Sequence, residues 1–558
     1  MKKHASGRFH LRAIAAAAGL AAVAQSASAL EFPLGDTTIK LDSLFTIGAS
    51  VRMEDRDPSL IGKSSLNPGI CVGRDGDDGV SGANPQRDQN QYHGTTCNPG
   101  QPSPDAAFAN ANDYFVAAPG SFNPNGDNGD QNFDKGDIVN AAAKITSDLS
   151  FNLYDFNFFV RGLALFDENY QGFEQTHLDT TFNPKHDALP AKAEDRLDMD
   201  FRLLDYFVSR TFEFADRQFN IKVGNQVLNW GESSFLLANS LNSINPPDQA
   251  RLRVPGFDIK ELSQPQGMIV FNAELFQGVN LETFYQYEWK PVIADPVGSF
   301  FSQSDIVGEG GSYAMLSFAK APEDPLGLYA PKYNPDSPVP VIGKVGDPAY
   351  ILNSSSSRTI KVDTAASEAH KAKDSGQYGA ALKFFLDGLN GGTEIGLYYA
   401  NYHSRVPSIS GYAAQATCLP DSVTTGVGLA QALNACGFPA GSASDLQTLG
   451  TLALSLPNPQ IALPDEALPL DTARLFIEYP EDIHMYGMSF NTTVGDWALS
   501  GEYVFRDNLP IQIHSTDLVF ALLQPAFPAN DLDLTIATLP GRRSAVPDFV
   551  QTAYRGVQ

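Results

Sequence analysis

Segments of alternating apolar and polar residues recur along most of this chain of 558 residues. A period of two residues is the period of a β-strand, in which successive side chains point to opposite faces of the sheet. The clearest alternating segments are residues 45–52, 139–146, 160–166, 219–226, 281–290, 378–384 and 497–506. Weaker ones lie at residues 199–211, 267–276, 393–404 and 482–493. We therefore expect an all-β protein with about eleven strands.

The connections between these segments are alternately short and long. The short connections are expected near residues 148–150, 214–217, 277–279, 387–392 and 494–496, and the long ones near residues 54–137, 167–198, 231–267, 290–376 and 405–481. Short connections at one end of a sheet and long ones at the other are typical of outer-membrane β-barrels. We therefore predict a transmembrane antiparallel β-barrel over residues 30–558, with long extracellular loops. A secreted sandwich or lectin would explain the alternation but not the regular order of short and long connections.

The strand count bears on how the barrel closes. About eleven strands is an odd number, whereas bacterial single-chain barrels have an even number. The chain ends at Gln558 inside what would be a sixth outer loop, and it lacks a last strand that finishes on an aromatic residue. We therefore expect that the C-terminal strands of the barrel are missing from this chain.

Residues 1–29 have the features of a secretory signal peptide. Four basic residues fall within the first twelve, residues 13–24 are rich in alanine, and Ala-Ser-Ala at residues 27–29 fits a cleavage site. The apolar stretch is too short to span a membrane as an anchor. Export combined with the strand pattern predicts the outer membrane of a Gram-negative bacterium, with outer-membrane lipid as the surrounding partner.

Charge and motif content exclude several classes of function. Asp and Glu outnumber Lys and Arg by 64 to 38, which gives a net charge of -26. Such a chain does not suit binding to nucleic-acid phosphates, so no nucleic-acid partner is expected. The sequence has no GxSxG, HExxH or glycine-rich phosphate loop, so we expect neither an enzyme nor a cofactor. A serine and a histidine on neighbouring strands would leave no such motif, and a hydrolase within the barrel stays an alternative.

The four cysteines fall in two of the long connections. Cys71 and Cys97 share the first, and Cys418 and Cys436 share the fifth. Pairing within each connection is the simplest of the three possible arrangements. Export to an oxidising compartment favours disulfides, and the spacing of a zinc site is absent.

Alternation places a set of charged side chains opposite the aliphatic face, on the lumen side of a barrel. These residues are Arg161, Lys222, Glu282, Glu288, Lys383, Glu502 and Arg506. They are candidates to set the ion selectivity of a pore, or to pair with one another and fill a small lumen. The aliphatic face ends in aromatic residues that fit a girdle at the lipid interface, namely Tyr287, Trp289, Trp497 and Phe505.

The third and fifth long connections contain unusual apolar groups. Trp230 and Glu232 follow the strand near residue 226, where they would line a ligand entrance or anchor the returning loop. Phe235 opens an apolar run in the third connection, and residues 426–435 and 446–455 are expected to form short helices in the fifth. Apolar loops exposed to water are unfavourable. We expect these loops to form a plug or lid, with loop packing without a ligand as the alternative.

Two acidic, glycine-rich runs lie in the first long connection, at residues 75–79 and 123–130. Asp75, Asp77, Asp127 and Asp130 offer the oxygen ligands that Ca²⁺ prefers. Neither run matches the twelve-residue calcium loop with its terminal Glu. We therefore expect a solvated loop and no metal site, and we keep these four residues only as calcium candidates.

Several motifs resemble one protein family. They are residues 223–233 (VGNQVLNWGES), 244–248 (INPPD), 252–256 (LRVPG), 285–289 (YQYEW), 376–379 (GQYG), 399–405 (YANYHSR), 479–482 (YPED) and 489–492 (SFNT). Through them the chain resembles the domain-of-unknown-function 1302 family of proteobacterial exported proteins over most of residues 30–558. The resemblance implies an outer-membrane protein that handles hydrophobic compounds, often beside lipid-transport-like partners, and it implies no agreed biochemical activity. Family members are usually longer at the C-terminus, which fits the expectation of missing strands.

These patterns together predict a channel or transporter for hydrophobic or amphipathic small molecules. A general aqueous porin is the first alternative, in which Lys222, Lys383 and Arg506 would set the ion selectivity. A non-transporting surface protein, such as an adhesin or a structural partner of a periplasmic lipid-handling system, is the second.

Overall fold

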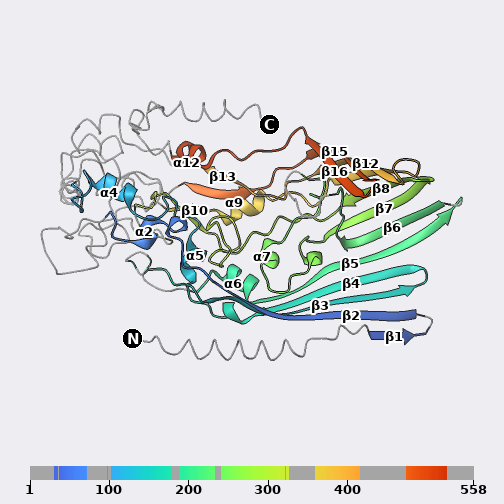
Figure 1. Ribbon diagram of the computed structural model, residues 1–558, viewed down its shortest axis with the longest axis horizontal. Helices are drawn as coiled ribbons and strands as arrows, with labels where there is room; N and C mark the ends of the chain where they lie inside the picture. The colour runs from blue at the N-terminus through green and yellow to red at the C-terminus, as the bar shows by residue number, and fades with distance from the viewer. Residues whose placement is uncertain are drawn as a thin grey trace, which may run out of the picture.

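The computed structural model describes residues 30–71 without 36, 97, 102–178, 180, 183, 188–232 without 216, 240–320, 322–323, 325, 359–414 and 473–523. Its main feature is a single twelve-stranded antiparallel sheet, in which each strand pairs with the next one in the series (Figure 1). The strands are β1 (Leu30–Leu34), β2 (Thr37–Val51), β3 (Ile138–Leu153), β4 (Phe156–Asp167), β5 (Met199–Phe214), β6 (Arg217–Gln226), β7 (Gln266–Phe276), β8 (Val279–Gln286), β11 (Gln377–Leu386), β12 (Thr393–Tyr402), β15 (Ile483–Val494) and β16 (Trp497–Arg506). The prediction of a mainly β protein with a large antiparallel sheet is confirmed.

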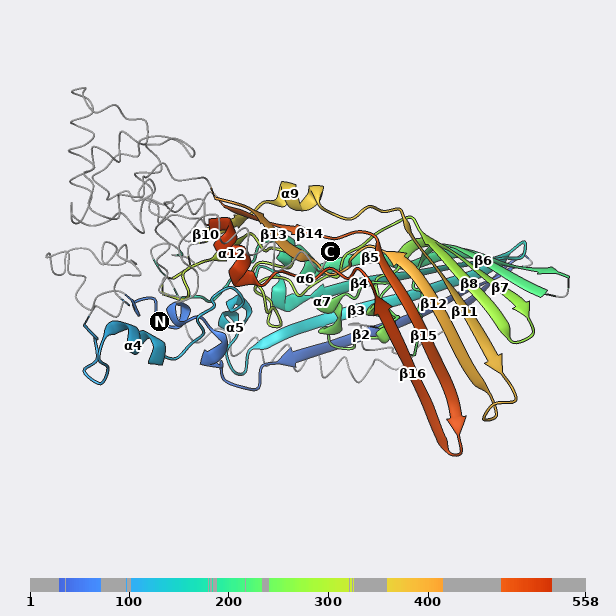
Figure 2. The same ribbon diagram turned by 90° about the horizontal axis from the view of Figure 1, so that it is seen from above.

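The sheet is strongly twisted. Seen from above, β15 and β16 run at a steep angle to β2 and β3 (Figure 2). Adjacent strands in a sheet rotate by about 20–25° on average, so twelve strands accumulate a large rotation. Within the described residues, β1 and β16 are the two ends of the sheet and are not paired with each other.

A second, small sheet is built entirely from the long connections. It contains β9 (Tyr313–Met315), β10 (Thr359–Val362), β13 (Ser408–Tyr412) and β14 (Arg474–Glu478), in the order β13-β14-β10-β9. Helix α12 (Ser515–Leu523) packs beside it through a cluster that includes Ile360, Leu475 and Leu522. Figure 1 shows β10 and β13 of the small sheet on the side of the molecule away from the short turns.

The helices are short and lie in the same long connections or after β16. Besides α12 they are η1 (Pro58–Leu60), α2 (Lys63–Leu66), α4 (Ala111–Ala117), α5 (Asn128–Asn132), η3 (Glu168–Tyr170), α6 (Ala191–Leu197), α7 (Gln249–Leu252), η4 (Ile259–Glu261) and α9 (Thr364–Ala369). In the described part of the chain, none of these helices has the length and apolar character needed to cross a membrane. The expected helices at residues 426–435 and 446–455 lie outside the described residues.

Most of the expected short connections join consecutive strands as predicted. The connections at residues 214–217, 277–279, 387–392 and 494–496 do so, but the one expected at residues 148–150 is wrong, because those residues lie inside β3. The turn falls at Tyr154 and Asp155, which both have positive φ, of 48° and 65°. Such dihedrals suit a tight hairpin turn and usually select Gly or Asn, so this sequence carries a weak turn signal. An additional hairpin, β1–β2, turns at Gly35 and raises the strand count to twelve.

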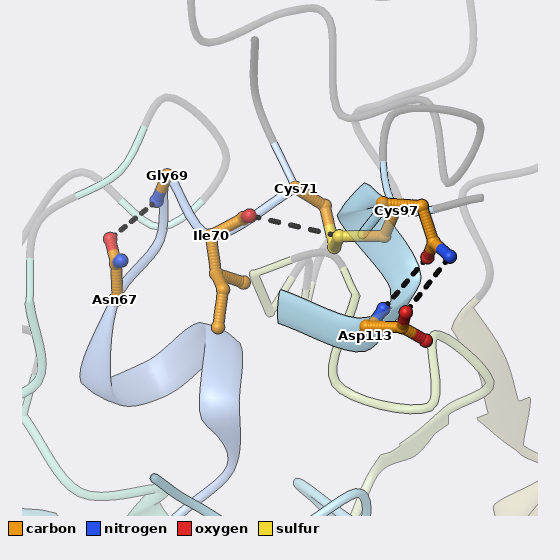
Figure 3. Close-up of a disulfide and its surroundings, with 7 residues drawn as sticks. Asn67, Gly69, Ile70, Cys71, Cys97 and Asp113 are labelled. Atoms are coloured by element: carbon orange, nitrogen blue, oxygen red, sulfur yellow. Dashed lines mark hydrogen bonds between the residues drawn. A yellow bond between two sulfur atoms is a disulfide. The ribbon is translucent and has the colours of Figure 1, made fainter. Parts of the chain in front are cut away.

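One of the two expected disulfides lies in the described residues and is confirmed. The sulfur atoms of Cys71 and Cys97 are 2.04 Å apart, and the pair is buried with Ile70 and Phe115 (Figure 3). Figure 3 shows the bridge beside Asp113 of α4, and the bridge links residues 71 and 97 within the first long connection. Cys418 and Cys436 lie outside the described residues.

Candidate functional site

The two faces of the large sheet have the opposite distribution of polarity to that of a sheet in a soluble protein. One face exposes large apolar side chains, with Phe201 79 % exposed and Trp497 75 % exposed. The other face buries polar side chains, among them Gln226, Gln266 and Gln286. A soluble sheet buries its apolar face and wets its polar one. The polar face is therefore the one on which a functional site is to be sought.

Three of the four aromatic residues expected on the exposed face are exposed. Tyr287, Trp497 and Phe505 are exposed, but Trp289 is buried, so its assignment to the exposed face is wrong. Its indole N–H donates to the carbonyl oxygen of Ser404 at 3.2 Å, and its ring meets that of Tyr479 edge-on. Trp289 follows the end of β8, where the alternation of faces no longer applies.

The third long connection lies on the polar face of the sheet. We call residues 227–232 and 240–265 the interior segment. Trp230 is its centre: the indole is fully buried, its ring centroid lies 5.2 Å from Phe284 and 5.4 Å from Tyr398, and its N–H donates to Oε1 of Glu282 at 2.6 Å. Leu241 and Ile244 of the same segment complete this apolar cluster.

The interior segment contacts strands near the beginning of the sheet. Lys144 of β3 forms an ion pair with Glu261 at 2.7 Å, and both side chains are 2 % exposed. Lys144 also donates to the carbonyl oxygen of Gly256 at 2.8 Å. Pro255 lies close to β2. A Cβ atom added at Gly48 would be only 2.5 Å from the Cβ atom of Pro255. This part of the segment is thus held by both charge and close backbone approach.

The same segment contacts the last two strands. The Glu502 carboxylate on β16 accepts hydrogen bonds from the backbone N–H groups of Glu232, at 3.0 Å, and Leu241, at 3.2 Å. Arg506 donates to the carbonyl oxygen of Ser240 at 2.7 Å and lies within hydrogen-bond distance of the Tyr402 hydroxyl, also at 2.7 Å. One segment therefore reaches strands near both ends of the series. Figure 1 shows α7 of this segment between the two groups of strands.

Arg161 and Lys222 on the same face also have side-chain partners. Arg161 pairs with Asp148 at 2.7 Å and with Asp205 at 3.2 Å. The Lys222 ammonium lies 3.8 Å from the centre of the Phe207 ring. Lys383 of β11 stands in register with Asn280 and Gly396 on its two neighbours.

The remaining predicted residues are as follows. The Glu232 carboxylate accepts a hydrogen bond from the Asn491 side chain at 3.1 Å. Phe235 lies outside the described residues, as do Asp75 and Asp77. Asp127 and Asp130 are described, and Asp130 lies 3.7 Å from Arg52.

Sequence reasoning missed a second group of charges that fixes the interior segment. Asp248, at the N-terminus of α7, is paired with Arg196 and with Arg202, the latter at 2.9 Å. Asp200 is paired with Arg251 and with Arg202. The sequence did carry a signal for this charge group: in the alternating segment 199–211, Asp200 and Arg202 fall on the same face of the strand.

Two cavities are of interest, one beside the interior segment and one among the other long connections. The smaller, of about 330 Å³, lies against the interior segment and is lined by polar groups that include Arg161, Asp205 and Asn229. The larger, of about 660 Å³, lies among the long connections, and Ile306, Met315, Ile360, Leu475, Leu518 and Val519 form much of its wall. The first cavity suits water or a small polar solute, whereas the second suits an apolar ligand.

Comparison with known proteins gives a family and no described activity. No curated protein and no protein of solved structure matches the chain. The family model described as "Protein of unknown function (DUF1302)" matches residues 10–557. That match covers essentially the whole chain, which therefore belongs to the DUF1302 family of proteins of unknown function.

Proposed function

We propose that this protein is an outer-membrane β-barrel that binds hydrophobic small molecules among its long outer connections and passes them toward its interior without chemical conversion. The observation that carries the proposal is the apolar cavity of about 660 Å³ among those connections. Its volume falls within the range of about 300–1,000 Å³ that is typical of small-molecule sites.

The polarity of the sheet supports the membrane location. A band of exposed Phe, Leu, Tyr and Trp on one face, with buried amides and ion pairs on the other, is the pattern of a barrel with lipid outside and polar groups inside. The signal peptide predicted at residues 1–29 supports export. Contact of the interior segment with both β3 and β16 supports a closed arrangement of the strands.

Introducing a charge into the apolar cavity tests the binding step. Leu518 of α12 lines the cavity. In the refolded protein, Leu518→Glu is expected to weaken binding of the fluorescent probe N-phenyl-1-naphthylamine by about tenfold or more, because an apolar ligand would have to share its site with a carboxylate. Leu60→Glu makes the same change at an exposed site outside this cavity and should leave binding unaltered. Equal binding by Leu518→Glu and the wild type would refute the proposed binding site.

Conductance distinguishes this proposal from an aqueous porin. In the proposed state the interior segment occupies the polar face, and Arg506 holds Ser240 across it. The full chain refolded into planar bilayers is therefore expected to be electrically silent. Stable open steps would favour a porin with selectivity set by Lys222, Lys383 and Arg506. Silence together with no probe binding would favour a structural partner of a periplasmic lipid-handling system.

A further inference from the structure

Three carboxylates from distant parts of the chain converge in a buried position. One oxygen each of Asp127, Asp305 and Glu323 lies within 4.8 Å of the other two. Asp127 comes from the first long connection, and Asp305 and Glu323 come from the connection between β8 and β11. Asp127 is 0 % exposed and Asp305 is 2 % exposed. Carboxylates are almost never fully buried unless they are paired or bound to a metal.

The protein supplies little compensation for this charge. Among the described residues, none of the three carboxylates takes part in an ion pair, and Oδ1 of Asp305 has no hydrogen-bond partner. Oδ2 of Asp127 accepts from the N–H of Gly62 at 2.7 Å, and the other Asp305 oxygen accepts from the N–H of Asp127 at 3.2 Å. Glu323 accepts from the Tyr313 hydroxyl at 3.0 Å. One buried carboxylate oxygen, Oδ1 of Asp305, is thus left without any donor.

Burial and repulsion from neighbouring carboxylates raise the pKa values of all three carboxyl groups. Burial raises the pKa of Asp127 to about 6, against the lowering effect of the Gly62 N–H. Burial and the charge of Asp127 raise the pKa of Asp305 well above its usual value, and burial with the charges of Asp127 and Asp305 does the same for the pKa of Glu323. At neutral pH the site therefore needs either protons or a cation.

We propose that Asp127, Asp305 and Glu323 bind a Ca²⁺ ion that joins two of the long connections. Ca²⁺ takes oxygen ligands at about 2.3–2.6 Å, so any two ligand oxygens lie within roughly 5 Å of each other, as these do. A cavity of about 20 Å³ lies beside Glu323 and is lined by Ser64, Ser65 and Gln131. The hydroxyl oxygen of Ser64 has no hydrogen-bond partner either. Mg²⁺ fits less well, because it demands near-ideal octahedral geometry and gives up its water reluctantly.

The proposed ion site lies next to the wall of the apolar cavity. Asn125 and Ser304, each within two residues of a ligand, line the 660 Å³ cavity. The amide of Asn125 also bonds to the backbone of β9 at Met315, which lines the same cavity. Ca²⁺ therefore holds together one wall of this cavity, whether or not the cavity binds a substrate.

Calorimetric titration of the chelator-treated, refolded full chain with CaCl₂ tests the binding. We expect one Ca²⁺ per chain, and a rise in the apparent unfolding temperature on binding. The double variant Asp305→Asn/Glu323→Gln should bind at least about tenfold more weakly. It should also be at least as stable as the wild type in chelator, because it removes buried like charges. Asp113→Asn, an exposed carboxylate of α4, should behave as the wild type. No binding by the wild type, or unchanged binding by the double variant, would overturn the proposal.

The pH dependence separates a cation from shared protons. An acid with a raised pKa binds more protons in the folded than in the unfolded state, so stability falls as the pH rises from about 4 through the raised pKa. In chelator, the unfolding temperature of the wild type should therefore fall between pH 5 and pH 8. Saturating Ca²⁺ should remove most of this fall, and the double variant should show little of it in either condition. A fall in the wild type that Ca²⁺ leaves unchanged would show that protons, not a cation, neutralise the site.

Discussion

Replacing Glu261 with Met is expected to lower the free energy of unfolding by about 3–5 kcal/mol, because it leaves the Lys144 ammonium buried without its counter-ion. Lys144 and Glu261 are each 2 % exposed, and two Lys144–carboxylate hydrogen bonds of 2.8 and 2.7 Å join them. In the variant, the carbonyl oxygen of Gly256 would be the partner that remains for Lys144 among the contacts described. Urea unfolding of the protein in detergent micelles, followed by tryptophan fluorescence, measures the loss.

Two further variants show whether the loss comes from the unpaired charge. Lys144→Met/Glu261→Met removes both charges and should regain most of the stability, since apolar replacements of a buried pair are often neutral. Glu31→Met removes one partner of an exposed ion pair with Lys40 on the neighbouring strand and should cost less than about 1 kcal/mol. A double variant as unstable as Glu261→Met would mean that side-chain shape, not charge, fixes the interior segment here.

Replacing Trp230 with Ala is expected to cost about 3–5 kcal/mol, which is typical of large aromatic residues removed from a core. The indole is fully buried between Phe284 and Tyr398, so its loss leaves a cavity between the interior segment and the sheet. The change also removes the N–H donor to Glu282. The unfolding free energy measured in the same micelles gives the effect.

Matched aromatic changes locate the cause of this loss. Trp230→Phe keeps most of the packing but lacks the N–H, so it should cost less than Trp230→Ala and report the Glu282 contact. Trp497→Ala removes the same side chain from the exposed face of β16, where it is 75 % exposed, and should cost much less. Equal costs for Trp230→Ala and Trp497→Ala would contradict the assignment of Trp230 to a packed interior.

The sequence predicts the strands of the large sheet better than it predicts the long connections that pack against the sheet. Alternation has a period that depends only on the chain, so eleven segments and four of the five short connections could be read from it. It fails where local chemistry is atypical. Tyr154 and Asp155 form a turn without glycine. Trp289 lies past the end of β8, where odd and even positions no longer point to opposite faces of the sheet.

The interior segment and the other long connections depend on long-range contacts that the local sequence pattern does not reveal. Alternation places Arg161 on the polar face but does not name Asp205 as its partner, and it does not single out the buried pair of Lys144 and Glu261. Asp127 was visible as an acidic residue in a glycine-rich run, yet Asp305, which its backbone N–H contacts, is 178 residues away. Two of the predicted loops contribute strands to the small sheet, because short strands in irregular connections show no sustained period.

The reach of the interior segment has a consequence for the order in which the chain folds. Pairing of consecutive strands across short turns closes small loops, which cost little entropy and form early. Docking of the segment joins residues 117 positions apart at Lys144 and Glu261, and 266 apart at Ser240 and Arg506. The second contact cannot exist until β16 has been added to the sheet. The segment therefore completes its docking only on a fully assembled sheet, and its protection from protease reports the last step of assembly.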